Sequence, residues 1–357
     1  TVATMAAALV LQDISPSGRT LLARTDLLAS LVARPAPEVP EINLTWLDGS
    51  IVRDISADGG SIAFTEAGQG GGPNCGVFVR RLAEPDAVRL GDGWAEGLSP
   101  DGKAVLAIDP TRSPSLRIYP VGPGEVRPVA HPGIVDEQWA AWLPEGRSIA
   151  FAAHEKGSGP AIYVQDAGGG AARKVMPGGI AVGQIESPGV SLSPDGTRVA
   201  APDPAGALTI FSLGGGSSHA VPGAFPHEIP VGWSRDGSAL FVSSPNRVPD
   251  PIARIRLSDG KRELWRELAP SDPAGVGGVD PVVLAPDGRA YAYSCMTYLS
   301  TLFVAAFISA TLLPMIGLPF FLVPTCSFAS ACTMPSGTVR AWSGPGRMSE
   351  KIPNSVT

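Results

Sequence analysis

Histidine and carboxylate side chains are the groups of this chain that could bind a metal ion or move a proton. His219 and His227 flank one predicted loop, but nothing in the spacing of the histidines pairs them as zinc ligands. We therefore interpret them as hydrogen-bonding groups of the core or surface. None of the four belongs to an HExxH pattern: His131, His154, His219 and His227. A metal site would instead require convergence in space of His131, Glu137, Glu186, His227 and Glu228.

Nucleophile and phosphate motifs are also missing from the sequence. No GxSxG motif presents a serine nucleophile. The glycines of 68–72 (GQGGG) match neither GxGxxG nor the P-loop, and no helix is predicted after them to hold an anion. The four cysteines have no zinc spacing and are too few for a disulfide scaffold, although a Cys326–Cys332 bridge is conceivable. We predict no catalytic residue, no metal and no cofactor.

Acidic residues also recur within a repeated turn, where their predicted role is structural. An apolar stretch runs seven times into a Ser-Pro-Asp-Gly-like turn and then into a second apolar stretch, as in 97–108 (GLSPDGKAVLAI). The Asp or Glu side chain of such a turn can accept hydrogen bonds from nearby backbone N–H groups, and the glycine accepts a positive φ. The turn glycines lie 41 to 51 residues apart: Gly18, Gly59, Gly102, Gly146, Gly196, Gly237 and Gly288.

A strand-rich repeat of this length predicts an all-β fold, a β-propeller with one four-stranded antiparallel blade per unit. Seven turns indicate seven blades, with six as the alternative. The seventh unit shows three strands, so we expect the N-terminal segment, starting with residues 1–7, to close the ring. The predicted propeller domain is 1–307. Its 43 glycines and 36 prolines suit many short turns.

The predicted strand order separates short turns at one end from long, varied loops at the other. Function usually sits on loops that a rigid scaffold presents, so the long-loop face and the mouth of the central channel are the predicted binding region. The recurrent tryptophans are expected mainly to pack between blades. The candidate contacts on this face are Glu66, Asn74, Trp94, Trp139, Glu186, His227, Glu228, Asn246 and Asp272.

Charge and termini limit the function classes. The net charge of −6 argues against nucleic-acid binding. The chain begins at Thr1 and shows no signal-peptide pattern, which suggests a piece of a longer protein. We expect a monomeric propeller, with membrane association only through the tail or a missing upstream span.

The C-terminal tail, 308–357, differs abruptly from the repeats. No charged residue and no histidine occurs in the fifty positions of 290–339. Residues 299–323 are long enough to span a bilayer, but two prolines interrupt them. The favoured interpretation is a frameshifted or read-through end. A membrane anchor and an extra apolar element packed on the propeller are the alternatives.

Longer segments carry a resemblance to a known family. The turn units resemble TolB-type, WD-like propellers. Residues 42–81 (INLTWLDGSIVRDISADGGSIAFTEAGQGGGPNCGVFVRR) and 262–294 are more similar still to the C-terminal propeller regions of bacterial receptor-like serine/threonine kinases. The resemblance covers about 8–306 and departs from the family at Cys75, where an aromatic residue is usual. It implies a propeller outside the cytoplasm and a kinase in a missing N-terminal part, because no kinase motif occurs here.

The sequence thus predicts a non-catalytic binding or sensor module for a protein or small ligand, extracytoplasmic or periplasmic. A TolB-like periplasmic interaction scaffold is one alternative. A propeller hydrolase or lyase with its site at the channel mouth is the other, and it would need charged residues that converge on the axis.

Overall fold

The computed structural model describes residues 9–17, 19–176, 179–183, 185, 187–245, 247–286 and 288–306. The chain divides into a unit spanning Thr1–Leu312 and a second spanning Leu313–Thr357, and all described residues lie in the first. The predicted tail, 308–357, and the Cys326–Cys332 pair lie outside the described residues. Cys295 is a buried free cysteine.

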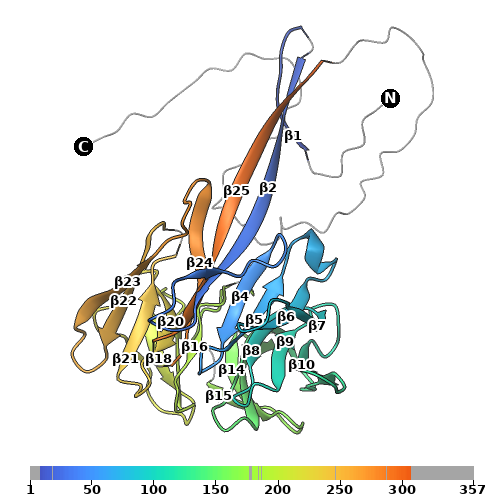
Figure 1. Ribbon diagram of the computed structural model, residues 1–357. Helices are drawn as coiled ribbons and strands as arrows, with labels where there is room; N and C mark the ends of the chain where they lie inside the picture. Colours follow the sequence, from blue (N-terminus) through green and yellow to red (C-terminus); the bar gives the residue numbers. More distant parts are fainter. Residues whose placement is uncertain are drawn as a thin grey trace. The chain divides into compact units, whose positions relative to one another are not determined.

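The described strands form six antiparallel sheets, which we name A to F (Figure 1). Five of them are consecutive four-stranded meanders whose first strand is the innermost. Sheet B contains β4 (Ser50–Ile55), β5 (Ser61–Glu66), β6 (Gly76–Arg81) and β7 (Val88–Asp92). Sheet C contains β8 (Trp94–Leu98), β9 (Ala104–Ile108), β10 (Leu116–Pro120) and β11 (Arg127–Pro128). A 3-10 turn, η1 (Gln69–Gly71), lies in the loop between β5 and β6.

The next three sheets repeat this order. Sheet D contains β12 (Ile134–Trp142), β13 (Ser148–Glu155), β14 (Ala161–Asp166) and β15 (Arg173–Met176). Sheet E contains β16 (Ser191–Leu192), β17 (Arg198–Pro202), β18 (Leu208–Ser212) and β19 (His219–Ala220). Sheet F contains β20 (Ile229–Trp233), β21 (Ala239–Ser243), β22 (Asp250–Arg256) and β23 (Arg262–Leu268).

Sheet A joins the two ends of the described chain. Its inner strands are β24 (Val276–Leu284) and β25 (Tyr291–Ala306), and β25 pairs with β2 (Arg19–Arg34). The outer edge of β2 carries β3 (Ile42–Asn43) near the ring and β1 (Leu9–Ile14) farther along. The ring is thus closed by β2 and β3. The predicted closing strand, residues 1–7, lies outside the described residues.

The predicted all-β propeller is confirmed, but seven blades are not: the described strands form six sheets. The first and seventh units share sheet A. The first unit was expected to fold as four strands, but residues 19–34 (RTLLARTDLLASLVAR) contain no Gly or Pro and form one sixteen-residue strand. That strand pairs along its whole length with β25, so it cannot fold back into a blade of its own.

Apolar clusters between successive sheets hold the ring together. Each cluster draws buried residues from two neighbouring sheets, and the last one joins F back to A, so no sheet of the ring lacks a neighbour on either side. Pairs that share a cluster are Phe64 and Ala292 (A and B), Val77 and Val105 (B and C), Leu106 and Phe151 (C and D), Ile162 and Phe211 (D and E), Ile210 and Leu240 (E and F), and Phe241 and Tyr293 (F and A).

The repeated turn is built by its own side chains. In the turn after β8, Ser99 Oγ donates to Asp101 Oδ1 at 2.7 Å, and the same oxygen accepts the N–H of Lys103 at 3.1 Å. Gly102 adopts φ +69°. These hydrogen bonds hold the pKa of Asp101 below its usual value, the Ser99 bond contributing most. The turn glycines with positive φ are Gly59, Gly102, Gly146, Gly196, Gly237 and Gly288, whereas Gly18 lies outside the described residues.

Candidate functional site: the axial cavity

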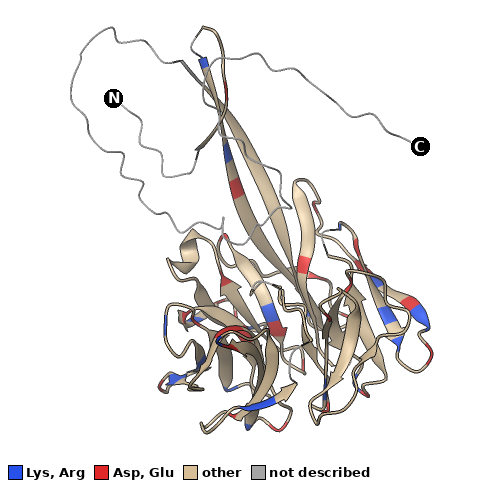
Figure 2. Cartoon of the chain, turned by 180° about the vertical axis from the view of Figure 1, so that it is seen from behind, with Lys and Arg blue, Asp and Glu red and all other residues tan. Residues whose placement is uncertain are grey.

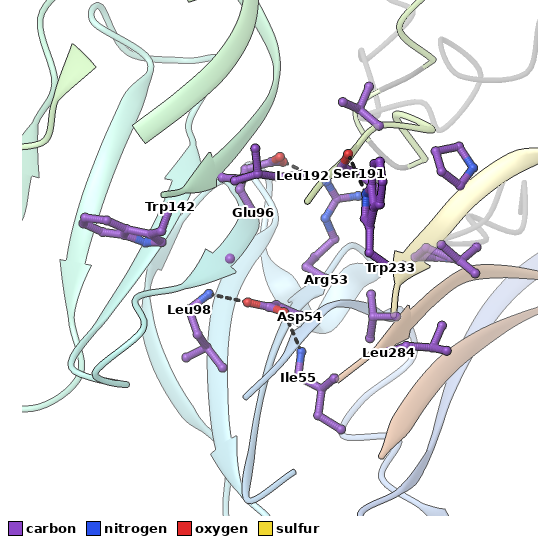
Figure 3. Close-up of a pocket in the computed structure, with 18 of the residues that line it drawn as sticks. Arg53, Asp54, Ile55, Glu96, Leu98, Trp142, Ser191, Leu192, Trp233 and Leu284 are labelled. Carbon is purple, nitrogen blue, oxygen red and sulfur yellow. Dashed lines mark hydrogen bonds and ion pairs between the residues drawn. The ribbon is translucent and has the colours of Figure 1, made fainter. Parts of the chain in front are cut away.

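The innermost strands of all six sheets line one cavity of about 480 Å³ on the propeller axis. The lining is apolar where Trp139, Val190 and Leu284 face it. Charged side chains come from three strands: β4 provides Arg53 and Asp54, β8 provides Glu96, and β24 provides Asp280. The cavity therefore holds one guanidinium among three carboxyl groups (Figure 3).

Arg53 and Glu96 form the central ion pair of this cavity. Arg53 Nη2 lies 2.9 Å from Glu96 Oε1, and the two side chains are 4% and 0% exposed. Arg53 Nε also donates to the carbonyl of Ala95 at 2.9 Å, and Glu96 Oε2 accepts the N–H of Ala140 at 3.0 Å. The pair thus ties sheet B to C and C to D. Burial raises the pKa of Glu96 to about 7, although Arg53 acts in the opposite direction.

Asp54 lies beside the pair and binds backbone groups. Its two carboxylate oxygens accept the N–H of Leu98 and the N–H of Ile55, both at 2.8 Å (Figure 3). Burial raises the pKa of Asp54 to about 6, because the loss of water outweighs these hydrogen bonds. The carboxyl group is therefore partly protonated just below neutral pH.

Asp280, in β24 of sheet A, provides a third carboxyl group. Burial raises its pKa to about 6, against the lowering effects of a hydrogen bond from Ser187 and of the Arg53 charge. Because Arg53 also lowers the pKa of Glu96 and of Asp54, one cation serves all three acids. With all three carboxyl groups ionised, the four side chains carry a net charge of −2.

β-Bulges position these charged residues. The register of β4 shifts between Val52 and Asp54, which brackets Arg53, and that of β8 shifts between Ala95 and Gly97, which brackets Glu96. In β24 the shift between Val279 and Val282 brackets Asp280. A bulge re-aims the side chain that it contains, so residues that strict alternation would assign to other positions reach the cavity.

The two ends of the cavity differ. At one end its lining includes the short turns that follow the inner strands, among them Ala57, Pro100 and Pro194. At the other end the connection from sheet D to sheet E carries Ile185 against Ile51 and Trp94 of sheets B and C.

Four of the predicted contact residues are buried. Glu66 is fully buried and accepts hydrogen bonds from the N–H groups of Leu47 and Gly49 and from Ser50 Oγ, and burial raises its pKa. Trp94 and Trp139 pack in apolar clusters. Glu228 is 2% exposed and forms an ion pair with Arg262. Glu66, Trp94 and Glu228 thus support the scaffold, whereas Trp139 also lines the axial cavity.

The other predicted contacts divide between the surface and the undescribed residues. Asn74 donates to Asp92 at 3.4 Å, and Asp272 accepts the N–H of Ala274 at 3.0 Å. His227 is exposed at φ +65°. Glu186 and Asn246 lie outside the described residues. Sequence reasoning did not select Arg53, Glu96 and Asp280 as site residues. A signal existed, because Arg53 and Glu96 each stand three residues before a turn serine.

A second cavity, of about 670 Å³, lies at the long-loop end between sheets C and D. Glu137 there accepts hydrogen bonds from Ser115 Oγ and pairs with His131 Nε2. Burial raises the pKa of Glu137, but these two partners lower it further, so the net shift is downward. Within the part of the chain that the structure describes, no three His, Cys, Asp or Glu side chains are arranged to hold a metal ion.

No protein-family model and no curated protein sequence matches the chain. Solved structures do match. A putative TolB from Agrobacterium tumefaciens is 17% identical with a TM-score of 0.56, over 76% of this chain and 99% of that chain. The fold is a β-propeller of the TolB type.

Two further solved structures give lower scores. TolB from Acinetobacter baumannii is 16% identical with a TM-score of 0.48, over 75% of this chain and 63% of that chain. Oligogalacturonate lyase from Vibrio parahaemolyticus is 13% identical with a TM-score of 0.47, over 74% and 77%.

Proposed function

We propose that this TolB-type propeller is a non-catalytic binding module, and that a protein segment or small ligand contacts its axial cavity through a cationic group. The observation that carries the proposal is the excess of carboxyl groups over cations in a cavity of about 480 Å³. A ligand cation would compensate the charge that Arg53 leaves unbalanced. The exposed His227 and Asp272, with Asn74, are candidate outer contacts for a larger partner.

The hydrogen bonding of the acids supports binding rather than catalysis. Both oxygens of Asp54 accept backbone N–H groups, and Glu96 is held by Arg53 and by the N–H of Ala140. A general acid or base needs a carboxyl oxygen that reaches the substrate. These acids instead hold inner strands in place and set the field of the cavity.

The cellular setting is part of the same proposal. The resemblance of 8–306 to kinase-associated propellers supports an extracytoplasmic sensor that belongs to a larger signalling protein. The TolB-type fold supports a periplasmic interaction scaffold equally well. Either setting needs a rigid ring that presents one binding cavity, which a closed propeller supplies.

The test is a titration with two capped tetrapeptides, one of lysine and one of glutamate, into the full chain. We expect the lysine peptide to bind and the glutamate peptide not to bind. Asp280→Asn removes one cavity charge and should weaken lysine-peptide binding about tenfold, which corresponds to about 1.4 kcal/mol. Asp86→Asn, in the exposed turn between β6 and β7, is the matched control. Equal binding of both peptides, or equal effects of both substitutions, would contradict the proposal.

A further inference from the structure

Sheet A extends beyond the ring as a ribbon. β24 pairs with β25 only as far as Thr297, whereas β2 and β25 pair from Arg34↔Tyr291 to Arg19↔Ala306. The N–H of Tyr298 still donates to the carbonyl of Gly275 at 2.9 Å, so it is residues 299–306 that pair with β2 alone. β1 covers the far edge of β2 along residues 20–24. We call β1, residues 19–27 of β2 and residues 298–306 of β25 the ribbon; Figure 1 shows it continuing past the end of β24.

The ribbon gathers much of the exposed apolar surface of the described residues. One face carries Tyr298, Leu302 and Val304, which are 48%, 64% and 69% exposed. Because directly paired residues share a face, Leu27 and Ala23 of β2 lie on it as well. Seven of the thirteen exposed large apolar residues belong to the ribbon: Val10, Leu11, Ile14, Tyr298, Leu299, Leu302 and Val304. Soluble surfaces seldom concentrate apolar side chains in this way without a partner.

Charged residues are few on the ribbon, and all of them lie on β1 and β2. β25 has no charged residue from Tyr291 to Ala306, and it is drawn in tan, without blue or red, in Figure 2. On β2 the Arg24–Asp26 ion pair, 2.8 Å long, lies opposite Thr301 and Leu299, on the face away from Leu302. In the middle of the ribbon the face of Leu302 is therefore uncharged, whereas Asp13 and Arg19 lie on that same face at the distal end. The opposite face carries the ion pair and also exposes Leu11, Ile14 and Leu299.

We propose that the apolar face of the ribbon, formed by Val10, Tyr298, Leu302 and Val304, lies on a lipid bilayer. The length and composition of the chain beyond β25 select this occupant. Residues 307–357 continue from Ala306, at the far end of the ribbon, and 307–339 contain no charged residue. A second copy or a protein partner would cover the ribbon face but would leave that adjoining apolar sequence unaccounted for.

The ribbon lies on the bilayer rather than across it. The edges of β1 and of residues 299–306 present backbone groups that no neighbouring strand of sheet A pairs. Such edges are costly in hydrocarbon, whereas water hydrates them at the interface. Among the described residues, no helix has the length and apolar character to cross a membrane.

The test is co-sedimentation of the full chain with vesicles of phosphatidylcholine and phosphatidylglycerol. Leu302→Glu places a charge in the middle of the apolar face, and Val304→Glu does the same one position farther along that face. Leu264→Glu on β23 is the matched control, because Leu264 is 62% exposed but belongs to sheet F. We expect both ribbon variants to bind vesicles at least tenfold more weakly than the unsubstituted chain, and the control to bind normally. Unchanged thermal unfolding of all three variants shows that they fold.

Three outcomes would overturn the inference. The full chain could fail to sediment with vesicles. All variants could bind equally, which would assign vesicle binding to 307–357 without the ribbon. The chain could form a dimer that Leu302→Glu dissociates without any vesicle binding, which would assign the face to a second copy. None of these results bears on peptide binding at the axial cavity.

Discussion

Arg53 and Glu96 depend on each other for charge compensation, because their side chains are 4% and 0% exposed. Removing Arg53 leaves a buried carboxyl group beside Asp54 and Asp280, with no cation to balance it. We therefore expect Arg53→Met to lower the free energy of unfolding by about 3–5 kcal/mol at pH 8. Urea denaturation measures this loss. The double variant Arg53→Met/Glu96→Leu should recover a large part of it, and a double variant as unstable as the single one would contradict this view.

The raised pKa values of the cavity acids predict a pH dependence of stability. Asp54 titrates near 6 in the folded protein and near 4 when unfolded, so between these values the folded state binds more protons. Its contribution to stability is complete below pH 4 and is lost as the pH rises through 6. Glu96 and Asp280 act in the same direction, with pKa values of about 7 and 6.

Asp54→Asn isolates one part of that dependence. Between pH 5 and pH 8 the unfolding free energy of the variant should fall by about 1 kcal/mol less than that of the unsubstituted chain. Urea unfolding at the two pH values measures both slopes, with Asp272→Asn as the control. An identical fall in Asp54→Asn and the unsubstituted chain would show that Asp54 is already ionised at pH 5.

The orientation of the charged cavity residues could not be predicted from the sequence. Asp54 stands out as an acid within an apolar strand, but Arg53 precedes it and would face the opposite side in an unbroken strand. The bulges that redirect Arg53, Glu96 and Asp280 depend on pairing with the next strand. No local pattern of residues predicts that pairing.

At the scale of the element, two turn glycines with the same backbone conformation differ in how tightly they are packed. Gly59 and Gly102 have nearly the same φ, +71° and +69°. A methyl group on Gly59 would lie 2.5 Å from the carbonyl oxygen of Pro35 and 2.9 Å from Cβ of Ala290, whereas one on Gly102 would meet nothing within 4 Å. We expect Gly102→Ala to cost about 1–2 kcal/mol through φ alone, and Gly59→Ala at least about 1 kcal/mol more. Equal losses on chemical denaturation would show that sheet A yields at this contact.

The closing strand offers a second comparison, within β2 and its partner. Leu31 is fully buried in the cluster between sheets A and B, whereas Leu302, in the same sheet, is 64% exposed. Leu31→Ala should lower the unfolding free energy by about 2–5 kcal/mol, and Leu302→Ala should change it by less than about 0.5 kcal/mol. Thermal or urea unfolding measures both changes in unfolding free energy. A small loss in Leu31→Ala would mean that the ring does not rely on closure by the N-terminal strand.

Strand positions around the turns follow from sequence because Ser, Asp and Gly form each turn locally, as the hydrogen bonds of Ser99 and Asp101 illustrate. The extent of β2 does not follow in the same way. A four-stranded first blade would need a turn within residues 19–34, but the Arg24-Thr25-Asp26 stretch contains no Gly or Pro, and pairing with β25 keeps it extended. Length without Gly or Pro was the available signal.

At the scale of the whole molecule, the repeat predicts a propeller, while closure decides how many sheets the repeats make. Counting turns gives seven units, but the turn before β2 and the turn before β25 belong to one sheet. Such a merger of the chain ends removes free edges from the ring. It depends on contacts between residues more than 250 positions apart, which no sequence window contains.

The most direct test of the binding proposal is hydrogen–deuterium exchange of the full chain with and without the capped lysine tetrapeptide. We predict slower exchange in β4, β8 and β24, which carry Arg53, Asp54, Glu96 and Asp280, and in the short turns that follow β4 and β8. Slower exchange confined to the long loops 67–75 and 269–275, or no change anywhere, would contradict the assignment of the axial cavity as the binding site.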